Sequence, residues 1–103
     1  MLSLSIIRAD LKDIRYYYVR KKLFDEAGAL TGQTNEILQT VNLYNDAMRK
    51  ASPRLYDLYY SLYIRNHTQE SLSAELGFTP EYVQKLNKKL LKFLQTVVVK
   101  ETA

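Results

Sequence analysis

The chain has 103 residues, of which 47% are hydrophobic, so it can fold as one compact domain and is not expected to stay disordered. Its net charge of +4 is compatible with nucleic acid or an anionic membrane surface, and its lack of cysteine excludes disulfides and suits a reducing cytoplasm. Neither a signal peptide nor a membrane span is expected, because Arg8 and Asp10 interrupt the first apolar segment and no basic segment precedes it.

An all-α fold is predicted, because three glycines and two prolines leave few helix breaks and strand signals are nearly absent. The first segment forms a long amphipathic helix in this prediction, and Gly28 and Gly32 end it or mark the turn after it. Its apolar stripe has the spacing of three and four that one helix face requires. The stripe consists of Leu4, Ile7, Leu11, Ile14 and Tyr18. It fits an arm that joins two chains, and equally a helix that packs on its own chain.

A second helix is predicted from Thr34 or Asn35 to Ala51, with Thr34 and Asn35 as candidate N-caps. Ser52 followed by Pro53 is a start signal for a third helix, because the hydroxyl can accept a backbone N–H and proline has none to leave unpaired. This helix, from Pro53 to about residue 66, is apolar on nearly every face, so we expect it to be central.

The last third of the chain meets the three requirements of a helix-turn-helix. Leu72 and Leu76 can face inward from the first helix, and Gly77 tolerates the left-handed backbone of the turn. Val83 and Leu86 can face back from the second helix. Small Ser73 lets the helices approach, and Phe78 can fill the gap under the turn.

The second of these helices is predicted from Pro80 to about Gln95, after Thr79 as its N-cap. Its inner stripe is Val83, Leu86, Leu90 and Leu94, with Phe93 adjacent. The β-like segment at residues 96–99 follows it, and we expect that segment to fray.

The outer face of that helix resembles a DNA-reading face, whose first turns enter the major groove. Gln84 can pair with adenine, Lys85 with guanine, and Glu81 can accept from cytosine. The later lysines suit phosphates, as do the backbone N–H groups where the first helix opens. The predicted DNA-contacting residues are Thr68, Gln69, Thr79, Glu81, Tyr82, Gln84, Lys85, Lys88, Lys89 and Lys92. A lysine-rich face that is merely solvated is the plain alternative.

Two stretches carry a family resemblance: YYSLYI at residues 59–64 and TQESLSAELGFTPEYV at residues 68–83. They resemble the fourth region of bacterial sigma factors, and the layout of the chain is similar to phage ArpU/RinA-type late-gene regulators. The resemblance implies a helical arm over residues 1–51 and a helix-turn-helix domain over residues 52–103. It also places base-reading positions on Pro80, Glu81, Gln84 and Lys85, where proline departs from the usual polar residue and cannot donate a hydrogen bond.

These observations predict a sequence-specific transcription regulator of phage or prophage type in the bacterial cytoplasm, with duplex DNA as its partner. The arm would join a homodimer, half-sites would lie about 10 bp apart or a multiple of that, and RNA polymerase is a candidate further partner. One alternative is a phage small-terminase-like DNA-packaging subunit, which a ring of many subunits would favour. Another is a helical protein-interaction module without DNA contact.

No catalytic, metal or cofactor site is predicted, and the chain is not expected to be an enzyme. His67 has no cysteine companion and no metal-ligand spacing. Gly28 and Gly32 do not form a phosphate-binding loop.

Overall fold

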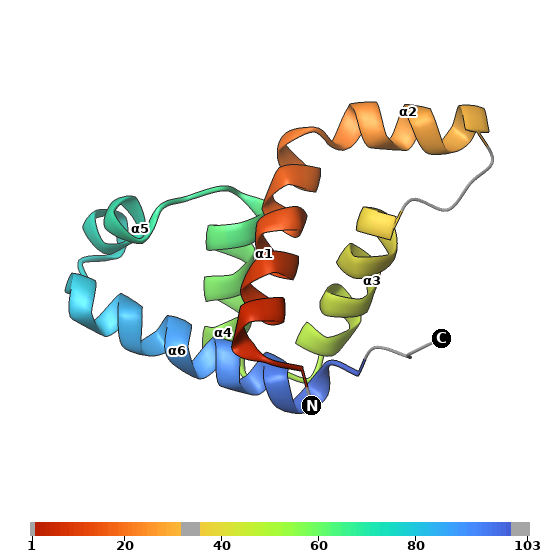
Figure 1. Ribbon diagram of the computed structural model, residues 1–103. Coiled ribbons are helices and arrows are strands. Elements are labelled where there is room, and N and C mark those ends of the chain that lie inside the picture. The colour runs from red at the N-terminus through yellow and green to blue at the C-terminus, as the bar shows by residue number, and fades with distance from the viewer. Residues whose placement is uncertain (1, 32–35, 100–103) are drawn as a thin grey trace.

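The computed structural model describes residues 2–31 and 36–99, and their regular structure is entirely helical, which confirms the predicted all-α class. Figure 1 shows α1 across the front, α4 behind it, α6 along the bottom and α5 at one end. The order of elements is α1 (Leu4–Val19), α2 (Lys21–Thr31), α3 (Glu36–Met48), α4 (Pro53–Tyr59), the π-helical turn η1 (Tyr60–Ile64), α5 (Gln69–Leu76) and α6 (Pro80–Val97).

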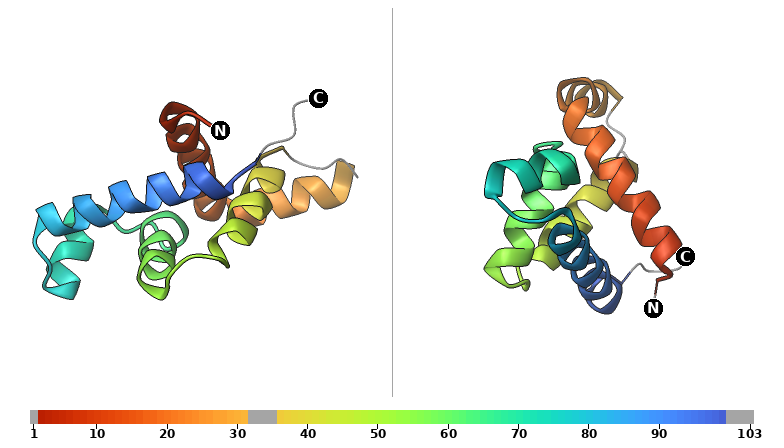
Figure 2. Two further views of the ribbon diagram at one scale, coloured as in Figure 1. Left: turned by 90° about the horizontal axis from the view of Figure 1, so that it is seen from below. Right: turned by 90° about the vertical axis from the view of Figure 1, so that its left-hand side faces the viewer.

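Helix α1 packs across one side of the molecule, against α3, η1 and α6 (Figures 1 and 2). Ile7, Leu11 and Ile14 are each at most 2% exposed and belong to one core with residues of α4 and α6. The apolar stripe of the first segment is therefore used within the chain. Residues on both sides of the predicted division at residue 51 belong to this one core, so the two segments pack together as a single hydrophobic cluster.

The prediction of one long first helix is wrong at its C-terminal end. Arg20 leaves the helical conformation at φ −116°, and α2 then begins at Lys21. The turn brings Phe24 back against Tyr16 and Tyr17, with ring centroids 5.6 and 5.9 Å apart. A run of aromatic and β-branched residues before the turn also lowers helix propensity. Gly28 falls inside α2 instead of ending a helix. Gly32 and the two predicted N-caps, Thr34 and Asn35, lie outside the described residues.

A buried polar pair connects α1 to α3. The Tyr44 hydroxyl donates to Asp10 Oδ2 at 2.6 Å, and both side chains are buried. Burial raises the pKa of Tyr44, and the bond to the carboxylate raises it further. A buried carboxylate is costly without hydrogen-bond donors, so this bond fixes how the two helices face each other.

The third predicted helix begins where expected but changes character midway. Ser52 caps it by accepting the Leu55 N–H at 3.4 Å, with proline at the first helical position. The chain then widens into η1, where the Arg65 N–H donates to the Tyr60 carbonyl at 2.9 Å. Tyr56 and Tyr60 are 43% and 42% exposed, but the segment is central as expected, because η1 packs against α1 and α5 and α4 packs against α6.

The C-terminal segment does not fray as predicted. Helix α6 continues to Val97, and the Val98 N–H donates to the Leu94 carbonyl at 2.9 Å. Val98 is 2% exposed, because its side chain completes the core beside α6. Its β-branched shape suits the extended conformation that it adopts after the helix.

Candidate nucleic-acid interface

The first helix of the predicted pair, α5, begins at a reciprocal cap. Thr68 Oγ1 accepts the Ser71 N–H at 3.0 Å, and Ser71 Oγ accepts the Thr68 N–H at 3.0 Å. These bonds satisfy two of the N–H groups that a helix start leaves unpaired. At this end of α5, Thr68 is exposed and Gln69 is half-buried, so a phosphate could approach. The Glu70 carboxylate lies in the same turn, however, and would repel an anion.

The turn between the two helices has the predicted left-handed glycine. Gly77 has φ 71° and ψ 18°, and the Phe78 N–H donates to the Ser73 carbonyl at 3.1 Å. The Ser73 hydroxyl donates to the Phe78 carbonyl, so this small buried residue ties the turn together as well as allowing close approach. Leu76 was expected to face inward and is instead 52% exposed, where it lines a pocket between α5 and α4.

Helix α6 begins at the predicted start signal. Thr79 Oγ1 accepts the Tyr82 N–H at 3.2 Å, and Pro80 follows at the first helical position. The hydroxyl of Thr79 therefore already serves as the cap, although the residue is exposed. The buried face includes Leu91, which the predicted inner stripe omitted. That face consists of Val83, Leu86, Leu90, Leu91 and Leu94.

The opposite face of α6 is polar and exposed to solvent. It carries Glu81, Gln84, Lys85, Lys88, Lys89 and Lys92, all exposed. Glu81, Gln84 and Lys85 are thus all exposed in the first turns of α6, after the helix break at Gly77. Figures 1 and 2 show that α5 and the first turns of α6 form one end of the molecule, far from α2 and α3.

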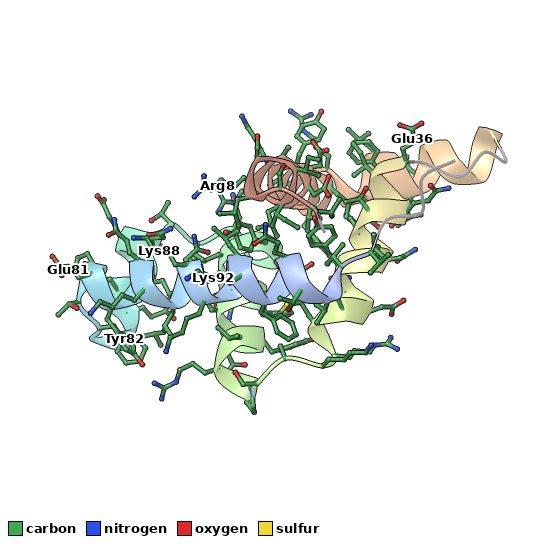
Figure 3. The ribbon with its side chains drawn as sticks, turned by 60° about the horizontal axis from the view of Figure 1, so that its bottom comes forward. Arg8, Glu36, Glu81, Tyr82, Lys88 and Lys92 are labelled. Carbon is green, nitrogen blue, oxygen red and sulfur yellow. The ribbon has the colours of Figure 1, made fainter. Side chains whose placement is uncertain are left out.

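Tyr82 differs from the other predicted contact residues because it is already engaged. Its ring packs edge-on against Phe78, with centroids 4.9 Å apart, and its hydroxyl accepts from Arg54 of α4. Figure 3 shows Tyr82 on the edge of α6 opposite to Lys88. Arg54 was not predicted to lie here, and the sequence has no signal for it, because the contact joins helices 28 residues apart.

A pocket of about 500 Å³ lies between α4, η1, α5 and the start of α6. Its apolar floor includes Leu58, Leu72 and Val83. His67 and Glu75 stand at its rim, with Nδ1 and Oε2 3.8 Å apart. His67, the one histidine of the chain, thus lies beside a carboxylate at this pocket.

Comparisons with known proteins found no matching family model, no matching curated protein and no matching solved structure. Among residues 2–31 and 36–99, no three histidine, aspartate or glutamate side chains come together as a metal site would require. Within the same ranges, no helix combines the length and apolarity needed to cross a bilayer.

Proposed function

We propose that this chain binds duplex DNA sequence-specifically through α6 and acts as a transcription regulator of phage or prophage type in a bacterial cytoplasm. The observation that carries the proposal is the joint exposure of Glu81, Gln84 and Lys85 at the start of a helix set off by the left-handed turn at Gly77. The resemblance to sigma region four and to ArpU/RinA-type regulators adds support from the sequence.

The shape of this end of the molecule suits the major groove. A helix with its side chains is about 10–12 Å across, and the groove is about 12 Å wide. Gln84 can bond both polar atoms of an adenine edge, Lys85 the acceptors of guanine, and Glu81 the amino group of cytosine. Pro80 packs at the helix start without a donor, so base reading begins at Glu81.

The lysines further along α6 supply the part of the affinity that does not depend on sequence. Lys88 and Lys92 follow the base-reading Lys85 at intervals of three and four, so they continue its face along about 10 Å of helix. Lysines in such a row can follow a phosphate backbone, and each contact releases counterions. Lys89 lies to the side of this row and can reach the same strand.

The partners follow from this mode of binding. A homodimer would present two recognition helices to half-sites about 10 bp apart, or a multiple of that, and RNA polymerase is a further candidate partner. The stripe first assigned to dimer contact is buried within the chain, so a dimer would have to use surface that the monomer leaves exposed.

Selection of bound duplexes from a random pool tests the proposal, because a reader of bases enriches a shared sequence. On the selected site, Lys85→Ala should relax the preference at one base pair as well as weaken binding. Lys88→Ala with Lys92→Ala should weaken binding to every sequence and reduce the salt slope by about 1.8, from about 0.9 per lost contact. Lys22→Ala with Lys50→Ala removes the same charge from other exposed positions and is the matched control. A pool that enriches no sequence, or a Lys88/Lys92 variant that binds like the control at every salt concentration, would refute the proposal.

A further inference from the structure

Basic residues of α1 stand on one edge of that helix. Arg8, Lys12 and Arg15 are spaced four and then three apart, so they share a face, whereas Asp10 and Asp13 point elsewhere. Asp10 is buried against α3 through its bond from Tyr44, so its carboxylate is held away from this edge. This segregation leaves the edge purely basic.

The basic edge of α1 is directed toward α6. The Arg15 Nε–H donates to the Leu62 carbonyl at 3.2 Å, and its guanidinium lies 5.2 Å from the centre of the Tyr63 ring. The Tyr63 hydroxyl in turn donates to Asn87 Oδ1 at 3.0 Å, one residue before Lys88. Burial raises the pKa of the Tyr63 hydroxyl, while the positive charges of Arg15 and Arg8 counteract that rise, so both guanidinium groups lie near it.

Figure 3 shows Arg8 on the same side of α6 as Lys88 and Lys92, with Tyr82 on the opposite edge. The start of α1 is fixed there, because the Gln95 side chain donates to the Leu2 carbonyl at 2.8 Å. Helix α1 therefore crosses the second half of α6 and leaves the tip with Glu81 free to enter a groove.

We infer that α1 is a second DNA-contacting element, in which Arg8 and Lys12 bind the phosphate strand that flanks the groove occupied by α6. Neighbouring helices pack about 8–10 Å apart, and the walls of the groove are about 12 Å apart, so a helix beside the inserted one faces a phosphate strand. Arg8 and Lys12 are exposed and long enough to reach it. Arg15 is half-buried and is held by the Leu62 carbonyl and the Tyr63 ring. It therefore fixes the position of this face of α1 and adds to its positive electrostatic potential.

This inference rests on the proposed function and revises the role of the first segment from a separate arm to part of the DNA surface. It also identifies which contacts carry sequence information. Phosphate contacts fix register without reading bases, so the α1 contacts should raise affinity equally for all sequences.

The test compares Arg8→Ala/Lys12→Ala with the control Lys22→Ala/Lys50→Ala, since both lose two positive charges from exposed positions. Binding to the selected duplex is measured by fluorescence anisotropy across a salt series. The α1 variant should lower the salt slope by about 1.8, bind more weakly at every salt concentration and keep the same sequence preference, whereas the control should match the native chain. Arg8→Glu/Lys12→Glu should weaken binding further while the far-ultraviolet circular dichroism stays native.

The outcomes separate the two proposals. If the native chain and the α1 variant bind the duplex with equal affinity and equal salt slope, the inference about α1 is wrong and the proposal for α6 stands. If the native chain does not bind duplex DNA even at low salt, both are wrong. A loss in the α1 variant no larger than in the control also overturns the inference, because net charge alone would then explain it.

Discussion

Replacing Gly77 by alanine tests the turn geometry on which the proposed DNA binding depends. A Cβ built on Gly77 meets nothing within 4 Å, so the substitution causes no clash and its cost is conformational. Holding an L-residue with a side chain at φ 71° costs about 1–2 kcal/mol, and the smaller entropy of the unfolded alanine chain changes this by about 0.4–1 kcal/mol. Since the entropy of the unfolded chain favours alanine and offsets part of the strain, we expect Gly77→Ala to lower the free energy of unfolding by about 0.5–1.5 kcal/mol.

Gly77→Asn is the matched comparison, because asparagine tolerates the left-handed region better than alanine does. Urea unfolding followed by circular dichroism measures the free energy of unfolding of both variants. In a thermal melt, each kcal/mol lost should lower Tm by about 4–8 °C. At temperatures where the variant is folded, Gly77→Ala should keep the DNA affinity of the native chain, since the new methyl group points into open space. Equal stability of the native, alanine and asparagine chains would refute a left-handed turn here, and a loss above about 3 kcal/mol would show that the methyl group does meet neighbours.

Three further outcomes concern hydroxyl groups. Tyr44→Phe should lower the free energy of unfolding by about 1–3 kcal/mol in urea, because the buried Asp10 carboxylate loses a donor. In the folded state the pKa values of Tyr44, Tyr59 and Tyr63 are raised from 10.0. Above about pH 10 these hydroxyl groups therefore lose their protons in the unfolded chain first. The free energy of unfolding should then fall, by up to about 1.4 kcal/mol per pH unit for each group. Tyr63→Phe should make that fall shallower, and an unchanged slope would contradict its raised pKa. Thr79→Ala should cost about 1 kcal/mol through loss of the α6 cap, whereas Thr79→Ser should cost less, and equal losses would argue against capping by the hydroxyl.

The features that could be predicted from the sequence are those in which neighbouring residues decide the structure. Ser52 and Thr79 each precede a proline, and each caps the helix that follows. Gly77 alone sets the left-handed turn. The exposed face of α6 was predictable for the same reason, since one helix with a strong apolar side must turn the other side to solvent.

The features that could not be predicted depend on contacts between distant segments. Leu76 has the spacing of an inner residue relative to Leu72, but it lines the pocket between α5 and α4 and stays half exposed, which only the packing of the helices decides. The break at Arg20 follows from aromatic residues folding back on one another, and no local breaker marks it. Arg8 became part of the candidate interface only when the packing of α1 on η1 and α6 was known.

The burial of the α1 stripe decides how Ile7→Asp should behave. Ile7, Leu11 and Ile14 are essentially unexposed in the single chain, and burying each contributes about 1.5–3 kcal/mol. Turning all three outward to form a coiled coil would cost about 5–9 kcal/mol, which is comparable to the whole stability of a small domain. A charge at position 7 should therefore unfold the chain, seen as loss of helical circular dichroism and of cooperative melting. A folded, monomeric Ile7→Asp chain on size-exclusion chromatography would instead mean that the stripe is an interface between chains, and the single-chain core would be the wrong description.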